Sequence, residues 1–240
     1  MTDKNRYYEV MDLNLSELNK SSANAEVSAT QKTYIALRKM IVIGDIKPGE
    51  KLKIEGLRKR LDTGASPIRE ALSLLTSDNL VERIDQRGFR ASPTSRKNFD
   101  EILMLRCELE DTALRQCIVN RTQDWEENIV ISHHRMVRAQ NAGDITFEDL
   151  HKEFHMALLG CYDAPILMKF CSQLYDLNIR YRYLAGSAMN YKRRDVSSEH
   201  QSIMAAAIAG DADEASAQLL SHYRETGAFL AGQLGEAELV

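Results

Sequence analysis

Histidines are the residues of this chain whose type and spacing could hold a metal ion. All six lie in the second half of the sequence. Two of them, His151 and His155, are four residues apart, so on a helix both imidazoles would point from one face. His200 and His222 would come from two later helices, which a helix bundle could bring alongside. Four imidazole nitrogens suit zinc, with nickel as a possible alternative.

Other interpretations of these histidines stay open. They could be surface or packing residues, as we expect for His133 and His134, which fit no ligand position. The segment from His151 to His155 is superficially similar to a zinc hydrolase motif, but Lys152 stands where that motif has its glutamate general base. No nucleophile elbow or phosphate-binding glycine loop is present. We therefore expect that the protein is not an enzyme, and a metal-dependent hydrolase is the distant alternative. The closer alternative is a protein in which the metal has a purely structural role.

The elements that must position these histidines are helices. Apolar residues recur at helical spacing almost without a break from residue 98 to residue 232. Clusters of glycine, aspartate and proline interrupt the pattern and mark the connections. The pattern predicts an all-helical region with helices near residues 98–119, 123–141, 146–161, 164–184, 191–209 and 212–231.

The region before residue 92 has a mixed pattern. Apolar spacing predicts helices over residues 31–43 and 54–61. Between them, Lys47-Pro48-Gly49-Glu50 is a turn signal, because proline presets φ and glycine tolerates a positive φ. The region therefore opens with two helices joined by a turn.

A third helix and a hairpin complete this region. The hydroxyl of Ser66 could cap the helix, and Pro67 suits its first position. Strands over residues 80–83 and 88–92 would then form a hairpin, with Gly88 supplying the positive φ of its turn. Helix, helix, turn, helix and hairpin are the order of a winged helix-turn-helix.

Charge agrees with DNA binding by this region. The whole chain has a net charge of −4, but residues 31–97 hold 15 Lys and Arg against 8 Asp and Glu. Basic side chains on the third helix and on the hairpin could grip a phosphate backbone from two sides. The residues expected to contact double-stranded DNA are Lys53, Ser66, Pro67, Arg69, Arg87, Gly88 and Arg90.

Composition also bounds the location of the protein. No run of 18 apolar residues exists, and the N-terminus lacks the apolar core of a signal peptide, so we expect a cytoplasmic protein without membrane contact. The four cysteines show no C-x-x-C pairing and are interpreted as reduced packing residues.

The sequence is expected to divide into five parts. They are a flexible N-terminal extension (1–29), a winged helix-turn-helix domain (30–92), a linker (93–97), a helical effector-binding and dimerisation domain (98–232) and a tail (233–240).

Several motifs of the first half resemble the GntR family of bacterial transcriptional regulators. They are Gly44-x-x-x-Pro48-Gly49-Glu50-x-Leu52, Ser66-Pro67-Ile68-Arg69-Glu70-Ala71-Leu72, Leu80-Val81 and Gln86-Arg87-Gly88-Phe89. Gly64-Ala65 stand where the family commonly has Ser-Arg. The combination is similar to a branch of the family linked to glutarate catabolism.

The second half resembles the FadR-type (FCD) effector domain of the same family, an antiparallel helix bundle. The resemblance rests on Arg106-x-x-Leu109-Glu110, Phe154-His155, Glu199-His200 and Gly210-Asp211 with His222. Many such domains hold a divalent metal through an aspartate and three histidines, and His151 stands at the aspartate position here.

The resemblance also implies an effector site and a function. It places Arg106 towards a ligand cavity, although Arg106 could instead form an i, i+4 ion pair with Glu110. Arg180 and Tyr181 are further effector candidates, because that part of the sequence is dense in polar recognition groups. We expect a transcriptional regulator, in the simplest case a repressor, that binds a two-fold operator as a homodimer and responds to a small carboxylate near the metal.

Overall fold

The computed structural model describes residues 28–85, 87–144, 146–161, 163–185 and 195–233, so nearly all of the predicted N-terminal extension and tail lie outside the described residues. The chain divides into two compact units, one ending at Ser92 and the other beginning at Pro93, with residues 42–44 grouped with the second. In the described part of the chain, no helix is both long and apolar enough to cross a bilayer.

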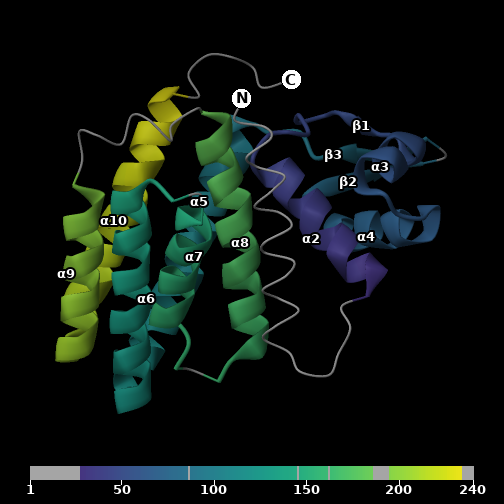
Figure 1. The fold of residues 1–240 in the computed structure, drawn as a ribbon. Coiled ribbons are helices and arrows are strands. Elements are labelled where there is room, and N and C mark those ends of the chain that lie inside the picture. The colour runs from purple at the N-terminus through teal and green to yellow at the C-terminus, as the bar shows by residue number, and fades with distance from the viewer. Residues whose placement is uncertain (1–27, 86, 145, 162, 186–194, 234–240) are drawn as a thin grey trace. The chain divides into compact units, whose positions relative to one another are not determined.

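The N-terminal unit is a winged helix-turn-helix, as predicted (Figure 1). A three-stranded antiparallel sheet has the order β1-β3-β2, and Arg90 of β3 lies opposite both Lys51 of β1 and Glu82 of β2. The sequence did not indicate β1, because a strand of two residues shows no alternation of apolar and polar side chains. The elements are α2 (Ala29–Val42), β1 (Lys51–Leu52), α3 (Ile54–Leu61), α4 (Ala65–Ser77), β2 (Val81–Ile84) and β3 (Gly88–Ala91).

The core of this unit forms around one face of α4. Ile68, Leu72 and Leu75 are completely buried, as are Leu37 and Ile41 of α2. These positions follow the helical spacing in the sequence, so burial of that face fixes which side of α4 remains outward. The outward side carries Ser66 and Arg69, which are exposed.

The start of α4 corrects the role expected for Ser66. The helix begins at Ala65, and Gly64 occupies the N-cap position without a side-chain cap. Ser66 lies inside the first turn, where its hydroxyl donates to Oε1 of Glu70 at 3.1 Å. Pro67 is tolerated one position further in, because N–H groups of a first turn have no acceptor within the helix.

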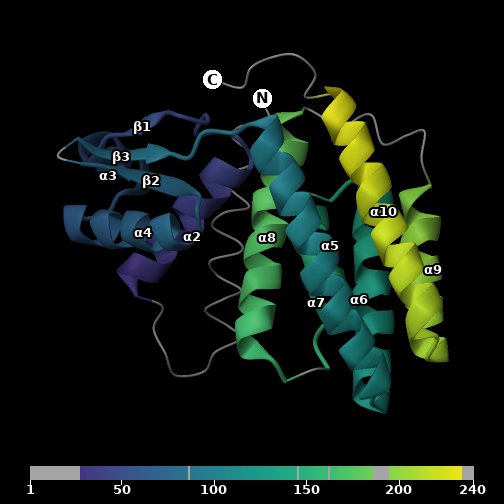
Figure 2. The same cartoon turned by 180° about the vertical axis from the view of Figure 1, so that it is seen from behind.

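The C-terminal unit is an all-helical antiparallel bundle. Figure 1 shows α6 beside α7 and α9, and Figure 2 shows α10 beside α5, in agreement with the packing of these pairs. Helix α5 starts at Arg96, so residues 96 and 97 of the predicted linker are helical. The segment 191–194, where the fifth of these helices was expected to start, lies outside the described residues. The helices are α5 (Arg96–Val119), α6 (Gln123–Ala142), α7 (Phe147–Leu158), α8 (Pro165–Leu184), α9 (Val196–Ala209) and α10 (Ala212–Gln233).

The bundle is held by an apolar core to which all six helices from α5 to α10 contribute. Phe154 of α7 is completely buried in it, together with Ile129 and Met136 of α6. Trp125 lies in the same core and donates its indole N–H to the carbonyl of Ala157 at 2.9 Å, which joins α6 to α7. This core holds α7 in place, and α7 carries His151 and His155.

We predict that Thr122→Ala destabilises the bundle by about 1 kcal/mol, because the Thr122 hydroxyl oxygen caps α6 by accepting from the N–H of Trp125 at 3.2 Å. Thr112→Ala, at an exposed threonine in the middle of α5, should change stability by less than about 0.5 kcal/mol. Urea unfolding followed by fluorescence of Trp125, the only tryptophan of the chain, reports on this unit. Equal losses in the two variants would contradict the capping role.

Candidate metal centre and DNA-binding surface

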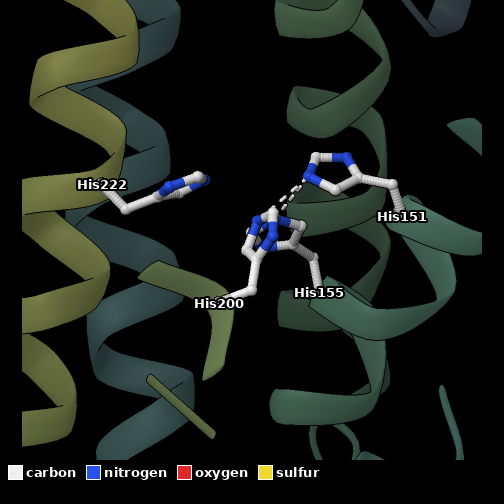
Figure 3. A group of neighbouring side chains, drawn as sticks. All are labelled: His151, His155, His200 and His222. Atoms are coloured by element: carbon white, nitrogen blue, oxygen red, sulfur yellow. Dashed lines mark hydrogen bonds between the residues drawn. The ribbon is translucent and has the colours of Figure 1, made fainter. Parts of the chain in front are cut away.

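Four histidines from three helices meet inside the bundle. His151 and His155 come from α7, His200 from α9 and His222 from α10, and all four are buried. Their rings turn towards a common region (Figure 3). One nitrogen from each ring can be chosen so that all four lie within 4.8 Å of one another. The structure therefore brings together the four residues that the sequence indicated.

The spacing of these nitrogens suits a metal ion. Nε2 of His151 lies 3.2 Å from Nε2 of His200 and 3.2 Å from Nε2 of His155. Two nitrogens bound to one tetrahedral zinc, each at about 2.0–2.1 Å, would be roughly 3.4 Å apart. The donor set is neutral imidazole, which late divalent metals such as zinc and nickel bind well.

Three of the rings are also held from outside by oxygen atoms. Nδ1 of His151 lies 2.5 Å from the hydroxyl of Tyr175, and Nδ1 of His155 lies 3.0 Å from the hydroxyl of Tyr223. Nδ1 of His222 is 2.7 Å from Oε2 of Glu199. When Nδ1 of each ring donates to its oxygen, Nε2 keeps its lone pair for a metal.

The charge state of the four histidines also favours metal binding. Burial lowers the pKa of both His151 and His155 well below the ordinary value of histidine, and the neighbouring imidazoles lower each pKa further. Neutral imidazole is the form that binds metal, so near neutral pH no proton has to be removed from these rings.

Arg106 of α5 lies next to this centre and forms the ion pair that the sequence offered as the alternative. Its Nε donates to Glu110 at 2.7 Å, both side chains are buried, and Nη1 donates to Asn178 at 3.1 Å. Burial alone would lower the pKa of Arg106, but Glu110, Tyr223 and Tyr175 together outweigh burial and raise the pKa above the ordinary value. The guanidinium also lies over the rings of Tyr223 and Tyr175, 4.2 and 5.0 Å from their centroids.

The other two effector candidates are not brought to the histidines. The hydroxyl of Tyr181 donates to Asn98 at 2.7 Å, and it accepts from the N–H of Ser95, near the start of α5. Arg180 is also buried, and burial lowers its pKa to about 10. At about 100° per residue, both positions are turned more than about 100° away from Tyr175, which does contact the cluster.

Arg182 lies near the cluster and was not among the effector candidates predicted from the sequence. It pairs with Glu148 at 2.7 Å, and its positive charge contributes to the lowered pKa of His151 and His155. Its distance of seven residues from Tyr175 places both on one face of α8, and this spacing could have identified it.

The two remaining histidines lie outside the cluster. His133 packs edge-on against Phe154, with ring centroids 5.3 Å apart, and His134 is exposed. Both therefore have the packing or surface roles expected for them.

The residues expected to contact DNA lie on the outward parts of the N-terminal unit. Arg69 and Ser66 are exposed on α4, and Pro67 is half-buried beside them. Lys53 is exposed at the N-cap of α3. The three-residue connection from α3 to α4 begins at Asp62, which adopts the left-handed conformation with φ of 44°. This arrangement leaves the N-terminal half of α4 able to enter a major groove.

The hairpin of β2 and β3 forms the wing. Arg87 and Gly88 are exposed, and Gly88 has a φ of 91°. Arg90 is half-buried and pairs with Glu82 across the hairpin at 2.7 Å. Its charge is therefore partly neutralised by the Glu82 carboxylate.

Comparisons with known families agree with this division. Residues 29–90 match the family described as bacterial regulatory proteins, gntR family, and residues 101–225 match the FCD domain. Both families consist of transcriptional regulators.

Individual relatives extend along most of the chain. It is 34% identical over 202 residues to the uncharacterized HTH-type transcriptional regulator BphR of Paraburkholderia xenovorans, covering 81% of this chain and 82% of that protein. It is 28% identical to the HTH-type transcriptional repressor GlaR of Escherichia coli, covering 79% and 90%. The solved structure of E. coli McbR/YncC has the same fold, with a TM-score of 0.76 at 24% identity, covering 88% of this chain and 100% of that one.

We predict that Arg69→Ala lowers affinity for a DNA fragment selected in vitro with the wild-type chain by at least about fivefold, because a base contact of an arginine on the recognition helix contributes about 1–3 kcal/mol. Arg138→Ala, at an exposed arginine of α6, is the matched control and should bind normally. Gel-shift titration measures both. Wild-type affinity in Arg69→Ala would remove this residue from the interface.

We predict that His200→Ala reduces the metal that remains bound after dialysis by more than about tenfold, because it removes one of four converging nitrogens. His134→Ala changes the same residue type at an exposed position outside the cluster and should leave the metal content unchanged. Elemental mass spectrometry of untagged protein gives the metal-to-chain ratio. An unchanged ratio in His200→Ala would refute the four-histidine site.

Proposed function

This chain belongs to the GntR family of bacterial regulatory proteins with an FCD domain, and on that premise we propose that a small carboxylate bound at a divalent metal controls its DNA binding. It is a DNA-binding transcriptional regulator and not an enzyme, as are the families and relatives that it matches. The observation that carries the proposal is the meeting of four buried imidazoles inside the bundle.

The metal in this proposal is a late divalent ion, zinc first and nickel second. His151, His155, His200 and His222 would hold it. The ion would supply a positive centre that polarises a bound anion. Four neutral ligands suit the softer members of the first transition series better than magnesium or calcium, which prefer oxygen.

Charge balance around the cluster supports an anionic ligand. Neutral imidazoles leave both positive charges of the ion in place, and the described carboxylate nearest to a ligand ring, Glu199, offsets one of them. Two neighbouring cations already have carboxylate partners, in the pairs Arg106–Glu110 and Arg182–Glu148. One positive charge therefore remains, and a buried uncompensated charge is costly. A single carboxylate group of the effector would balance it.

Dimerisation belongs to the same proposal. One recognition helix reads only a few base pairs, so a homodimer on a two-fold operator would supply the required specificity. An effector that prefers one arrangement of the bundles would shift the population and change the spacing of the two α4 helices. This change in spacing suits a repressor that dissociates from its operator when the carboxylate binds.

We predict that metal-loaded protein gains thermal stability from a small carboxylic acid, because a ligand at about 100 times its Kd adds about 2.7 kcal/mol to the folded state. Trp125 fluorescence during heating would screen acetate, lactate, succinate and glutarate, with acetamide as the uncharged control. The gain should vanish in His200→Ala and persist in His134→Ala.

Two outcomes would separate this proposal from its rival. If a chelator lowers the melting temperature while none of the acids changes it, the metal is purely structural. If an acid stabilises the loaded protein and also changes its affinity for the selected DNA fragment in a gel shift, the metal and the carboxylate belong to the regulatory mechanism.

A further inference from the structure

The hydroxyl of Tyr223 on α10 connects two buried groups. It donates to Oε2 of Glu110 on α5, and it lies 3.0 Å from Nδ1 of His155 on α7. All three side chains are buried. A hydroxyl has one proton, so once that proton goes to Glu110 the oxygen can only accept from His155.

This direction fixes the tautomer of His155. Its Nδ1 must carry the proton that Tyr223 accepts, and its Nε2 then keeps a lone pair. That Nε2 faces Nε2 of His151 at 3.2 Å, on the side where the four nitrogens meet. The proton on Nδ1 therefore prepares His155 to bind a metal ion.

Glu110 is in turn held as an acceptor. Arg106 donates to its Oε1 from Nε at 2.7 Å and to its Oε2 from Nη2 at 3.3 Å. Hydrogen bonds thus converge on the Glu110 carboxylate from two sides: Arg106 donates to it directly, and His155 donates to Tyr223, which donates to Glu110.

We propose that Tyr223 and Glu110 are positioning residues of the metal centre, which set the tautomer of His155 so that Nε2 is offered to the ion. The inference rests on the proposed metal site. It gives the Arg106–Glu110 pair a role beyond packing, because this pair holds the acceptor that orients a metal ligand.

The test uses two buried tyrosines of the same unit. Tyr223→Phe removes only the hydroxyl that contacts His155. Tyr181→Phe also removes a buried, hydrogen-bonded hydroxyl, but one that contacts Ser95 and Asn98 away from the cluster. Both variants keep the ring, and Trp125 fluorescence verifies that each one is folded.

Zinc affinity, measured by competition with a chromophoric chelator, should fall by about 10- to 100-fold in Tyr223→Phe and stay near the wild-type value in Tyr181→Phe. In metal-free protein labelled with ¹⁵N-histidine, His155 should be protonated at Nδ1 in the wild type and should become a mixture of tautomers in Tyr223→Phe. The tautomer is a readout that a role limited to packing would not change.

Equal affinity losses in both variants, or an unchanged tautomer in Tyr223→Phe, would overturn the inference. Wild-type protein that binds no zinc would refute the proposed metal site, whereas zinc binding that Tyr223→Phe leaves unaltered would refute the positioning role alone.

Discussion

The constraint on which the C-terminal unit depends is the meeting of imidazole nitrogens in its interior. Nε2 of His151 lies 3.2 Å from Nε2 of His200 and 3.2 Å from Nε2 of His155, among helices that also bury an apolar core. Neutral rings that direct lone pairs at one another repel unless a proton or a cation lies between them. Helices α7, α9 and α10 must hold this arrangement, and their packing against one core makes that possible.

The charges around the centre occur in pairs, of which Arg106–Glu110 is buried and Arg182–Glu148 is half-buried. Arg106–Glu110 and Arg182–Glu148 each combine opposite charges at 2.7 Å. Burying an ion pair costs desolvation energy that its attraction only partly offsets, so such pairs are a poor way to gain stability alone. Here the ion pairs fix the orientation of the side chains that form them. Glu110 accepts hydrogen bonds from both Arg106 and Tyr223.

The N-terminal unit differs from the bundle, because DNA binding requires its charged side chains to be exposed to solvent. Its core is the apolar face of α4 against α2, which leaves Arg69 outward. On the wing, the ion pair of Arg90 with Glu82 spans the hairpin, and Arg87 is exposed beside it. The unit is a scaffold that orients a few exposed cations, whereas the bundle is a scaffold that orients buried imidazoles.

Local spacing determined much of this protein by itself. It predicted the helices, the winged helix-turn-helix order and the shared face of His151 and His155, because a helix of 3.6 residues per turn places such residues together whatever surrounds them. Tertiary packing alone decided that His200 and His222 arrive at the same point, that Arg182 rather than Arg180 faces the centre, and that Tyr223 reaches His155. It also made Gly64 rather than Ser66 the cap of α4. The physical reason is that periodicity sets which residues share a face, while only the packing of whole helices sets which faces meet.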